Sequence, residues 1–235
     1  QIQWLGGMGI IVLAVAIMPL LGVGGMQLYR AETSGVAKDE KLTPRIAETA
    51  RSLWIIYLIL TALCGVAYYF AGMTLFDAVG HAFTTVATGG FSTHDDSLGF
   101  YNSPLIEFIA IIFMLAGGIN FAVHFIVFRK KLLSPYIKDA EVRTYGLVFL
   151  LASLFVAFSL YLSHAYGTVL ESLRYAAFQV ASVLTSTGFG TATFASWPLH
   201  IPLIMVILSF TGGCAGSTAG GVKVIRVILN DKLGV

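Results

Sequence analysis

The stretch TVATGGFST, residues 85–93, is rich in hydroxyl groups and centred on two glycines, yet it lies between long apolar segments. Hydrophobic residues make up 57% of the chain and charged residues 11%, whereas a soluble domain carries roughly 25% charged residues. This composition excludes an ordinary soluble globule. The stretch is therefore predicted to be a polar turn inside a membrane-embedded protein.

Apolar runs long enough to cross a hydrocarbon core of roughly 30 Å, which needs about 20 helical residues, recur along the chain. The first has no basic leader or cleavage site, so we interpret it as a mature span and not as a signal peptide. We predict an all-α, polytopic membrane protein. The five predicted spans are residues 4–22, 53–72, 104–128, 144–166 and an interrupted run at 197–229.

Basic residues cluster in the connections between these spans. Of 14 lysines and arginines, five lie in residues 23–52, five in residues 129–143 and three after residue 221. The positive-inside rule places these three segments on the cytoplasmic side, so that the five spans alternate in direction. Basic residues are not interleaved with exposed aromatic residues, so nucleic-acid binding is not expected.

Two segments on the opposite side, residues 74–87 and 170–186, have helix-compatible sequences too short to cross the membrane. Such segments are suited to re-entrant half-helices. Each runs into a threonine and a glycine, and a shift of 99 residues pairs Thr88-Gly89 with Thr187-Gly188. The chain is therefore predicted to contain an internal repeat of span, half-helix, glycine turn and span.

This repeat divides the chain into predicted units. They are the second span of an earlier repeat (1–22), a cytoplasmic connection (23–52), a complete pore repeat (53–128), a second cytoplasmic connection (129–143), and a second complete pore repeat (144–229) that contains a glycine-rich loop (211–221).

Irregular backbone at membrane depth is tolerated only where it is buried in protein or lines a wet cavity, because unpaired peptide groups are costly in hydrocarbon. A cation path satisfies this condition, since backbone carbonyls can replace the hydration shell of the ion. The half-helices direct their C-terminal ends, each carrying about half a negative charge, toward the turns. We therefore expect the turns to favour cations.

The glycine-rich loop contains five glycines in eleven residues. Each interior glycine costs about 1 kcal/mol of helix stability relative to alanine, so the last span should break here. A loop below the turns could obstruct the ion path, which predicts a gate; the alternative is a kinked helix with small residues at its crossings. The gate residues would be Gly212, Gly213, Cys214, Ala215, Gly216, Ser217, Thr218, Ala219, Gly220, Gly221 and Lys223. Lys223 could instead anchor the chain at the inner interface.

Five segments of the chain carry a family resemblance: QWLGGMGIIVLAVAIMPLLG (3–22), GGMQLYRAE (24–32), TVATGGFSTHD (85–95), SVLTSTGFGTATFASWP (182–198) and GGCAGSTAGGVKVIR (212–226). In these segments the sequence resembles the Trk, Ktr and HKT superfamily of potassium transporters. In that family four covalently linked repeats surround one pore, and each contributes a filter strand.

The resemblance implies potassium uptake through a carbonyl-lined selectivity filter gated by the glycine-rich loop, with K⁺ as the transported ion and no covalently bound cofactor. It also implies a homodimer in the bacterial inner (plasma) membrane that binds a cytosolic nucleotide-binding regulatory ring protein. The basic inner connections suit such a partner, but membrane lipid headgroups would attract the same charges. The filter residues by resemblance are Ala87, Thr88, Gly89, Ser186, Thr187 and Gly188, which would hold K⁺.

Three other functions remain as alternatives. A secondary transporter with re-entrant hairpins would couple Na⁺ or H⁺ to substrate movement, but inverted repeats are common in such folds, whereas these two repeats share one orientation. An enzyme would use Ser217 with His124 as base, but the GxSxG elbow is absent, so no enzyme is expected. A noncatalytic scaffold subunit would tolerate alanine at its glycine turns.

The remaining polar residues of the apolar segments are assigned to structure. Glu107 is interpreted as an interfacial or helix N-terminal acid, and Asn120 and His124, which share a helix face, as interhelical hydrogen-bonding groups. The same holds for Asp77 as a helix-dipole acid and for Glu171 with Arg174 as a local ion pair.

Overall fold

The computed structural model describes residues 2–9, 46–224 and 226. Within these residues the regular structure is helical, apart from one isolated bridge between Thr211 and Val222. The predicted all-α fold is therefore confirmed. The predicted span at 4–22 beyond residue 9, most of the connection at 23–52, and the end of the span at 197–229 lie outside the described residues.

The first repeat begins with α4 (Ile46–Phe70), a helix that starts several residues earlier than the sequence predicted. The half-helix α5 (Leu75–Val86) folds back along it, and the Thr74 side chain caps α5 by accepting from the Asp77 amide. The segments that follow are the 3₁₀ helix η4 (Ser97–Tyr101), α6 (Pro104–Gly117) and α7 (Phe121–Lys130). The predicted half-helix at 74–87 is thereby confirmed.

The span predicted at residues 104–128 is not one continuous helix, because α6 and α7 meet at an angle of 99°. Gly117 and Gly118 weaken the helix at this point, and the Asn120 side chain starts α7 by accepting from the Ala122 amide. A side chain at Gly118 would overlap the Tyr145 hydroxyl. Asn120 thus caps α7, and the interhelical hydrogen bond predicted for its side chain is not what it makes.

The second repeat follows the short helix α8 (Ser134–Lys138). It consists of α9 (Ala140–Leu162), the half-helix α10 (Val169–Leu184), the 3₁₀ helix η5 (Phe194–Ser196) and α11 (His200–Phe210). The predicted half-helix at 170–186 and the predicted break in the last span are both confirmed, since α11 ends at Phe210 and the chain continues irregularly from Thr211.

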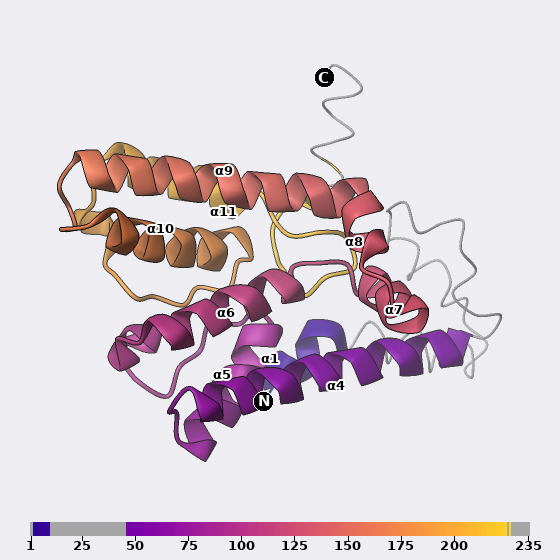
Figure 1. The fold of residues 1–235 in the computed structure, drawn as a ribbon. Coiled ribbons are helices and arrows are strands. Elements are labelled where there is room, and N and C mark those ends of the chain that lie inside the picture. Colours follow the sequence, from indigo (N-terminus) through magenta and orange to yellow (C-terminus); the bar gives the residue numbers. More distant parts are fainter. Residues whose placement is uncertain (1, 10–45, 225, 227–235) are drawn as a thin grey trace.

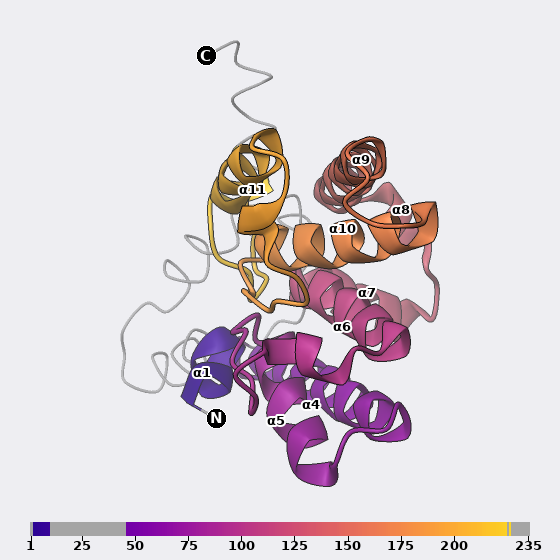
Figure 2. The same cartoon turned by 90° about the vertical axis from the view of Figure 1, so that its left-hand side faces the viewer.

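The long helices α4 and α9 lie on opposite sides of the molecule, with α5, α6 and α10 between them (Figure 1). Figure 2 shows the same arrangement from the side, with α9, α10 and α11 in one group and α4 and α5 in the other. By length and composition α4 and α9 can cross a membrane, and α6 with α7 is a third candidate if the bent pair counts as one span.

Residues 2–9, which form α1 (Ile2–Trp4) and the π-helical turn η1 (Leu5–Gly9), pack against α4. The Trp4 ring stacks on Tyr57 with centroids 5.1 Å apart, and its indole nitrogen donates to Thr61 at 3.0 Å. This contact fixes the first described segment on the first repeat.

An ion pair joins the two repeats. The Arg174 guanidinium of α10 donates to both carboxylate oxygens of Glu107 on α6, each at 2.6 Å. The bidentate partner of Arg174 therefore comes from the other repeat, whereas Glu171, the partner predicted from the sequence, interacts with it only through weaker electrostatic attraction. Since Glu107 is only 2% exposed, this pair fixes α10 against α6.

Candidate functional site

The half-helices end in two turns of the same backbone form, which we call the first turn (residues 87–91) and the second turn (residues 185–189). Thr88 and Ser186 adopt left-handed conformations with φ of 50° and 56°. Two residues later Gly90 and Gly188 also have positive φ, at 69° and 88°. Equivalent residues of the two turns are therefore 98 positions apart, and the predicted register of 99 is wrong.

The hydrogen bonds of the turns follow the corrected register. The Gly89 amide donates to the Thr84 carbonyl at 2.7 Å, and the Thr187 amide donates to the Ser182 carbonyl at 2.8 Å. The Thr84 and Ser182 hydroxyls in turn donate to the carbonyls of Phe91 at 2.8 Å and Phe189 at 2.7 Å. The counterpart of Gly188 is thus Gly90, and the Gly-Phe pair present in both turns is the sequence signal that identifies it.

The two turns have different surroundings. Phe189 is 2% exposed and belongs to the apolar core of the first repeat, whereas Phe91 is 65% exposed. Thr88 is buried, whereas its counterpart Ser186 is exposed. The turns also touch, because a side chain at Gly90 would overlap the Thr187 carbonyl. The structure therefore brings the six predicted filter residues into two adjoining turns.

The glycine-rich loop is closed at its base. The Gly212 amide donates to the Val222 carbonyl at 2.8 Å, and the Val222 amide donates to the Phe210 carbonyl at 2.9 Å. A side chain at Gly212 would overlap the Gly220 carbonyl, so the two ends of the loop approach as closely as only glycine permits.

Three backbone hydrogen bonds seat this loop on the break between α6 and α7. The Cys214 amide donates to the Gly118 carbonyl at 2.8 Å, and the Thr218 amide donates to the Gly117 carbonyl at 3.1 Å. In the opposite direction the Phe121 amide donates to the Gly216 carbonyl at 3.0 Å. The break in the first repeat is thus the binding surface for the loop of the second repeat.

The loop also contacts the first turn directly. The Thr88 hydroxyl donates to the Thr218 carbonyl at 2.9 Å. The Thr218 hydroxyl lies 2.9 Å from the Val86 carbonyl and 3.0 Å from the Gly117 carbonyl, to which it donates. The predicted gate loop and the predicted first filter strand are therefore hydrogen-bonded to one another.

A buried acid supports the loop from the other side. The Glu141 carboxylate, in the first turn of α9 and 3% exposed, accepts from the Ala215 amide at 2.7 Å. The sequence analysis missed this residue, because an acid at a helix start is ordinarily a dipole partner. Lys223 donates to the Ala219 carbonyl and the Ser217 hydroxyl to the Cys214 carbonyl, so both side chains bond within the loop region.

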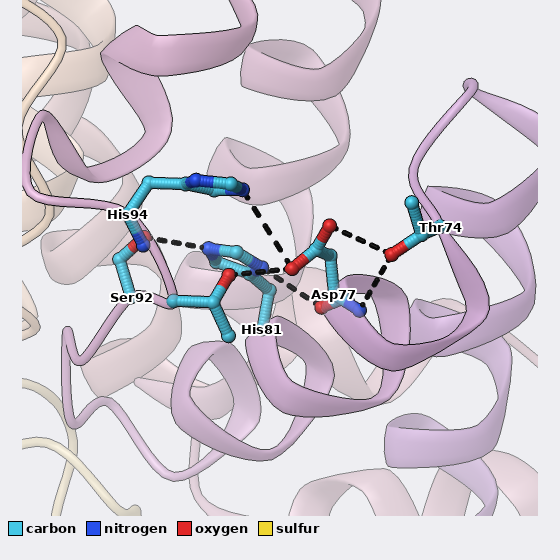
Figure 3. A network of polar contacts seen from close by, with 6 residues as sticks. Thr74, Asp77, His81, Ser92 and His94 are labelled. Atoms are coloured by element: carbon cyan, nitrogen blue, oxygen red, sulfur yellow. Dashed lines mark hydrogen bonds and ion pairs between the residues drawn. The ribbon is translucent and has the colours of Figure 1, made fainter.

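Figure 3 shows a polar network at the start of α5. The Asp77 carboxylate accepts from the Thr93 hydroxyl at 2.6 Å and from the Thr74 hydroxyl at 2.7 Å, and His94 Nε2 lies 3.6 Å from it. The hydroxyl donors, Thr93 foremost, lower the pKa of Asp77 to about 2. Asp77, predicted as a helix-dipole acid, therefore also holds the chain that leaves the first turn.

His81 belongs to the same network (Figure 3). Its Nδ1 lies 2.8 Å from the Asp77 carbonyl oxygen, and its Nε2 lies 2.9 Å from the Ser92 hydroxyl. His124 bonds elsewhere, with Nε2 at 2.9 Å from the Ala116 carbonyl and Nδ1 at 2.6 Å from the Tyr136 hydroxyl, so its predicted interhelical role is confirmed.

These features define a helical protein with helices long and apolar enough to cross a membrane, in which two half-helices end in adjoining turns and a glycine-rich loop contacts the first turn. Comparison with known families matches residues 1–235 to the family described as "TrkH: Cation transport protein". The chain belongs to the TrkH family.

The relatives agree with this assignment. The chain is 52% identical to "Trk system potassium uptake protein TrkH" of Halomonas elongata and 51% identical to the protein of the same name from Escherichia coli (strain K12), in each case over 100% of this chain and 48% of the relative. A solved structure, "Crystal Structure of the Potassium Transporter TrkH from Vibrio parahaemolyticus", matches 99% of this chain and 47% of that chain with 46% identity and a TM-score of 0.83. The chain thus spans about half the length of the relatives that it matches. These relatives are named as potassium uptake proteins or as a potassium transporter, and not as enzymes.

Proposed function

We propose that this protein takes up K⁺ across the bacterial inner (plasma) membrane as part of a multi-pass transporter. The two turns contribute two strands of a carbonyl-lined selectivity filter, and the glycine-rich loop is the gate. The observation that carries the proposal is the pair of adjoining turns, each at the C-terminal end of a half-helix and each with a left-handed glycine, Gly90 and Gly188.

The chemistry of the turns suits a partly dehydrated cation. Two half-helix C-termini direct negative potential to one place, and backbone carbonyls can replace the water around K⁺. In the corrected register the proposed filter residues gain Gly90 and Thr185 beside the six assigned from the sequence. They are residues 87–90 in the first turn and residues 185–188 in the second turn.

The two repeats run in the same direction, with α4 and α9 each leading into a half-helix of the same course. Parallel repeats favour a pore along the membrane normal over an inverted-repeat secondary transporter. Phe189 packs into the core of the first repeat, and we propose that the exposed Phe91 packs in the same way on the half-helix of an earlier repeat, whose second span is residues 1–22. The proposed cytoplasmic connections remain residues 23–52 and 129–143.

The proposed partners are inferred from the basic residues at one end of the molecule. Arg129, Lys130, Lys131 and Lys138 lie in and beside α7 and α8, at the end of the molecule where α4 and α9 begin (Figure 1). We propose that this end faces the cytoplasm and receives a nucleotide-binding regulatory ring protein and anionic lipid headgroups, with the transporter as a homodimer. These charges are the support for this assignment, since cationic segments are retained on the cytoplasmic side.

Flux measurements on the complete polypeptide in lipid vesicles test the filter. Gly188→Ser should lower the ratio of K⁺ to Na⁺ flux, because the left-handed backbone at this position is strained by any side chain. Gly190→Ser is the matched control, since a side chain there meets nothing within 4 Å and its φ is not positive. An unchanged flux ratio in folded Gly188→Ser protein contradicts the filter assignment.

The gate has its own test. Deleting part of residues 212–221 should raise K⁺ flux in the absence of any activator, because the obstruction is removed. If the folded deletion variant conducts no faster than the unmodified protein, the loop is packing and not a gate.

A further inference from the structure

We propose that Thr218 couples the gate to the filter, so that the glycine-rich loop and the first turn change conformation together. This inference rests on the proposed function and names a positioning residue within it. The observation that carries it is the hydrogen bond from the Thr88 hydroxyl to the Thr218 carbonyl, which joins two residues 130 positions apart in the sequence.

Thr218 contacts three structural units at once. Its hydroxyl is shared between the carbonyls of Val86, the last residue of α5, and Gly117, the last residue of α6. Its amide donates to the Gly117 carbonyl, and its own carbonyl accepts from Thr88. One residue of the loop therefore binds the end of the half-helix, the first turn and the helix break.

These contacts cannot survive a displacement of the loop. When the loop moves out of the path, Val86 and Thr88 lose partners that lie immediately before and within the first turn. Thr88 is 5% exposed and its hydroxyl also lies 2.8 Å from the Ala87 carbonyl, so it turns to that remaining partner within the first turn. The Val86 carbonyl loses the Thr218 hydroxyl, and buried polar groups are costly to leave unpaired. The first turn must therefore relax when the loop leaves, and the filter changes with the gate.

The second turn is not held in this way. It lies beside the loop at Gly220, where a side chain would come 3.3 Å from Ser186 Cβ, while the amides of Ser186 and Thr187 bond to carbonyls of α10. Ser186 is exposed, and the Thr187 hydroxyl pairs at 2.6 Å with Thr185 of the same turn. The coupling is thus specific to the first turn.

Coupling between two sites is reciprocal. If release of the loop alters the K⁺ affinity of the first turn by some factor, K⁺ bound at that turn must alter the equilibrium between the seated and the released loop by the same factor. An ion that orders the first turn preserves the Thr88 and Val86 contacts and so holds the loop in place. K⁺ should therefore slow the exposure of the loop.

Cys214 provides a native probe of loop position, because it lies within the loop and is 0% exposed. Its rate of modification by a membrane-permeant maleimide is followed in the complete polypeptide in vesicles. Peptide mass spectrometry distinguishes it from Cys64, which is also buried. In the protein without substitutions we expect Cys214 to react at least roughly five-fold more slowly in K⁺ than in choline. A factor of about five is the lower end of typical coupling between two sites.

Thr218→Val removes the hydroxyl while retaining the shape of the side chain. We expect faster Cys214 modification, loss of the difference between K⁺ and choline, and a lower ratio of K⁺ to Na⁺ flux. Thr218→Ser keeps the hydroxyl and should restore all three properties. The matched control is Thr144→Val, the same substitution in α9, which removes a hydroxyl bond to the Ala140 carbonyl outside the filter and the gate and should leave the flux ratio unchanged.

The outcomes separate the coupling from the proposed function. If Gly188→Ser alters selectivity while Thr218→Val alters neither selectivity nor the K⁺ dependence of Cys214, the coupling is wrong and the filter stands. If neither variant alters selectivity, the filter assignment fails as well. If Thr218→Val does not fold, the protein without substitutions still tests the coupling. Equal rates of Cys214 modification in K⁺ and in choline would then overturn it.

Discussion

The first and second turns have one backbone course and two different environments. The first turn is covered by the glycine-rich loop, with Thr88 bonded to Thr218, whereas the second turn exposes Ser186 and Gly188. The burial of the phenylalanine differs in the opposite sense, since Phe189 of the second turn is buried in the neighbouring repeat and Phe91 of the first turn is exposed. A repeated backbone therefore does not imply a repeated role, because the partners of each turn come from elsewhere in the chain.

The two phenylalanines give the largest expected difference. Phe189→Ala removes a ring from the core of the first repeat and should lower the free energy of unfolding by about 3–5 kcal/mol, as measured by thermal unfolding in detergent. Phe91→Ala should cost less than about 0.5 kcal/mol in the chain described here, because its ring is exposed. An equal cost for both variants in the complete polypeptide would support an earlier repeat that covers Phe91, whereas a small cost there would contradict that repeat.

Gly90 and Gly188, the left-handed glycines of the two turns, should differ in the stability cost of a substitution by alanine. Gly90→Ala combines a left-handed backbone with overlap of the Thr187 carbonyl and should cost about 2–5 kcal/mol, whereas Gly188→Ala has open space and should cost about 1–2 kcal/mol for its backbone alone. Gly146→Ala in α9, where a side chain meets nothing within 4 Å, is the control and should stabilise the helix by up to about 1 kcal/mol, because alanine favours helix over glycine. Equal effects at Gly90 and Gly188 would show that the turns do not touch.

The contact between the repeats can be broken at its ion pair. Arg174→Met leaves the Glu107 carboxylate buried without its partner and should cost about 2 kcal/mol, below the value for fully buried pairs because Arg174 is 21% exposed. Glu171→Gln is the control and should change the unfolding temperature little. A larger loss for Glu171→Gln than for Arg174→Met would restore the local pair that the sequence suggested.

The smallest expected effect lies beside the first turn. Asp77→Asn should weaken the bonds from Thr93 and Thr74, at about 1 kcal/mol, since a typical hydrogen bond contributes about 0.5–1.5 kcal/mol. The Asp77 pKa falls from 3.8 to about 2 in the folded protein, so the carboxylate stabilises the fold above pH 4 and this advantage disappears as the pH falls toward 2. Unfolding measured across this pH range in both proteins should show the difference shrinking, and a constant difference would contradict the role of the carboxylate.

Local features of the sequence were sufficient for the two half-helices, for the break in the last span and for the place of the turns, but not for the break between α6 and α7. The half-helices were recognisable because short apolar segments end at threonine and glycine, and the last span broke where five glycines in eleven residues make helix unfavourable. The register of the turns was not recovered, because matching Gly89 with Gly188 by identity ignored the Phe91 and Phe189 that follow. The assignment of filter and gate residues stays a prediction that the experiments above test.

The sequence by itself determined an all-α protein with apolar helices of membrane-spanning length and two half-helices, because apolar length, capping residues and glycine content act over a few neighbouring residues. Only the tertiary structure decided that α6 and α7 separate at Gly118, that Arg174 pairs with Glu107, and that Thr218 bonds to the first turn. Each of these depends on the approach of groups far apart in the chain. Burial gives such contacts their strength, and no local pattern encodes which distant partner a buried polar group will find.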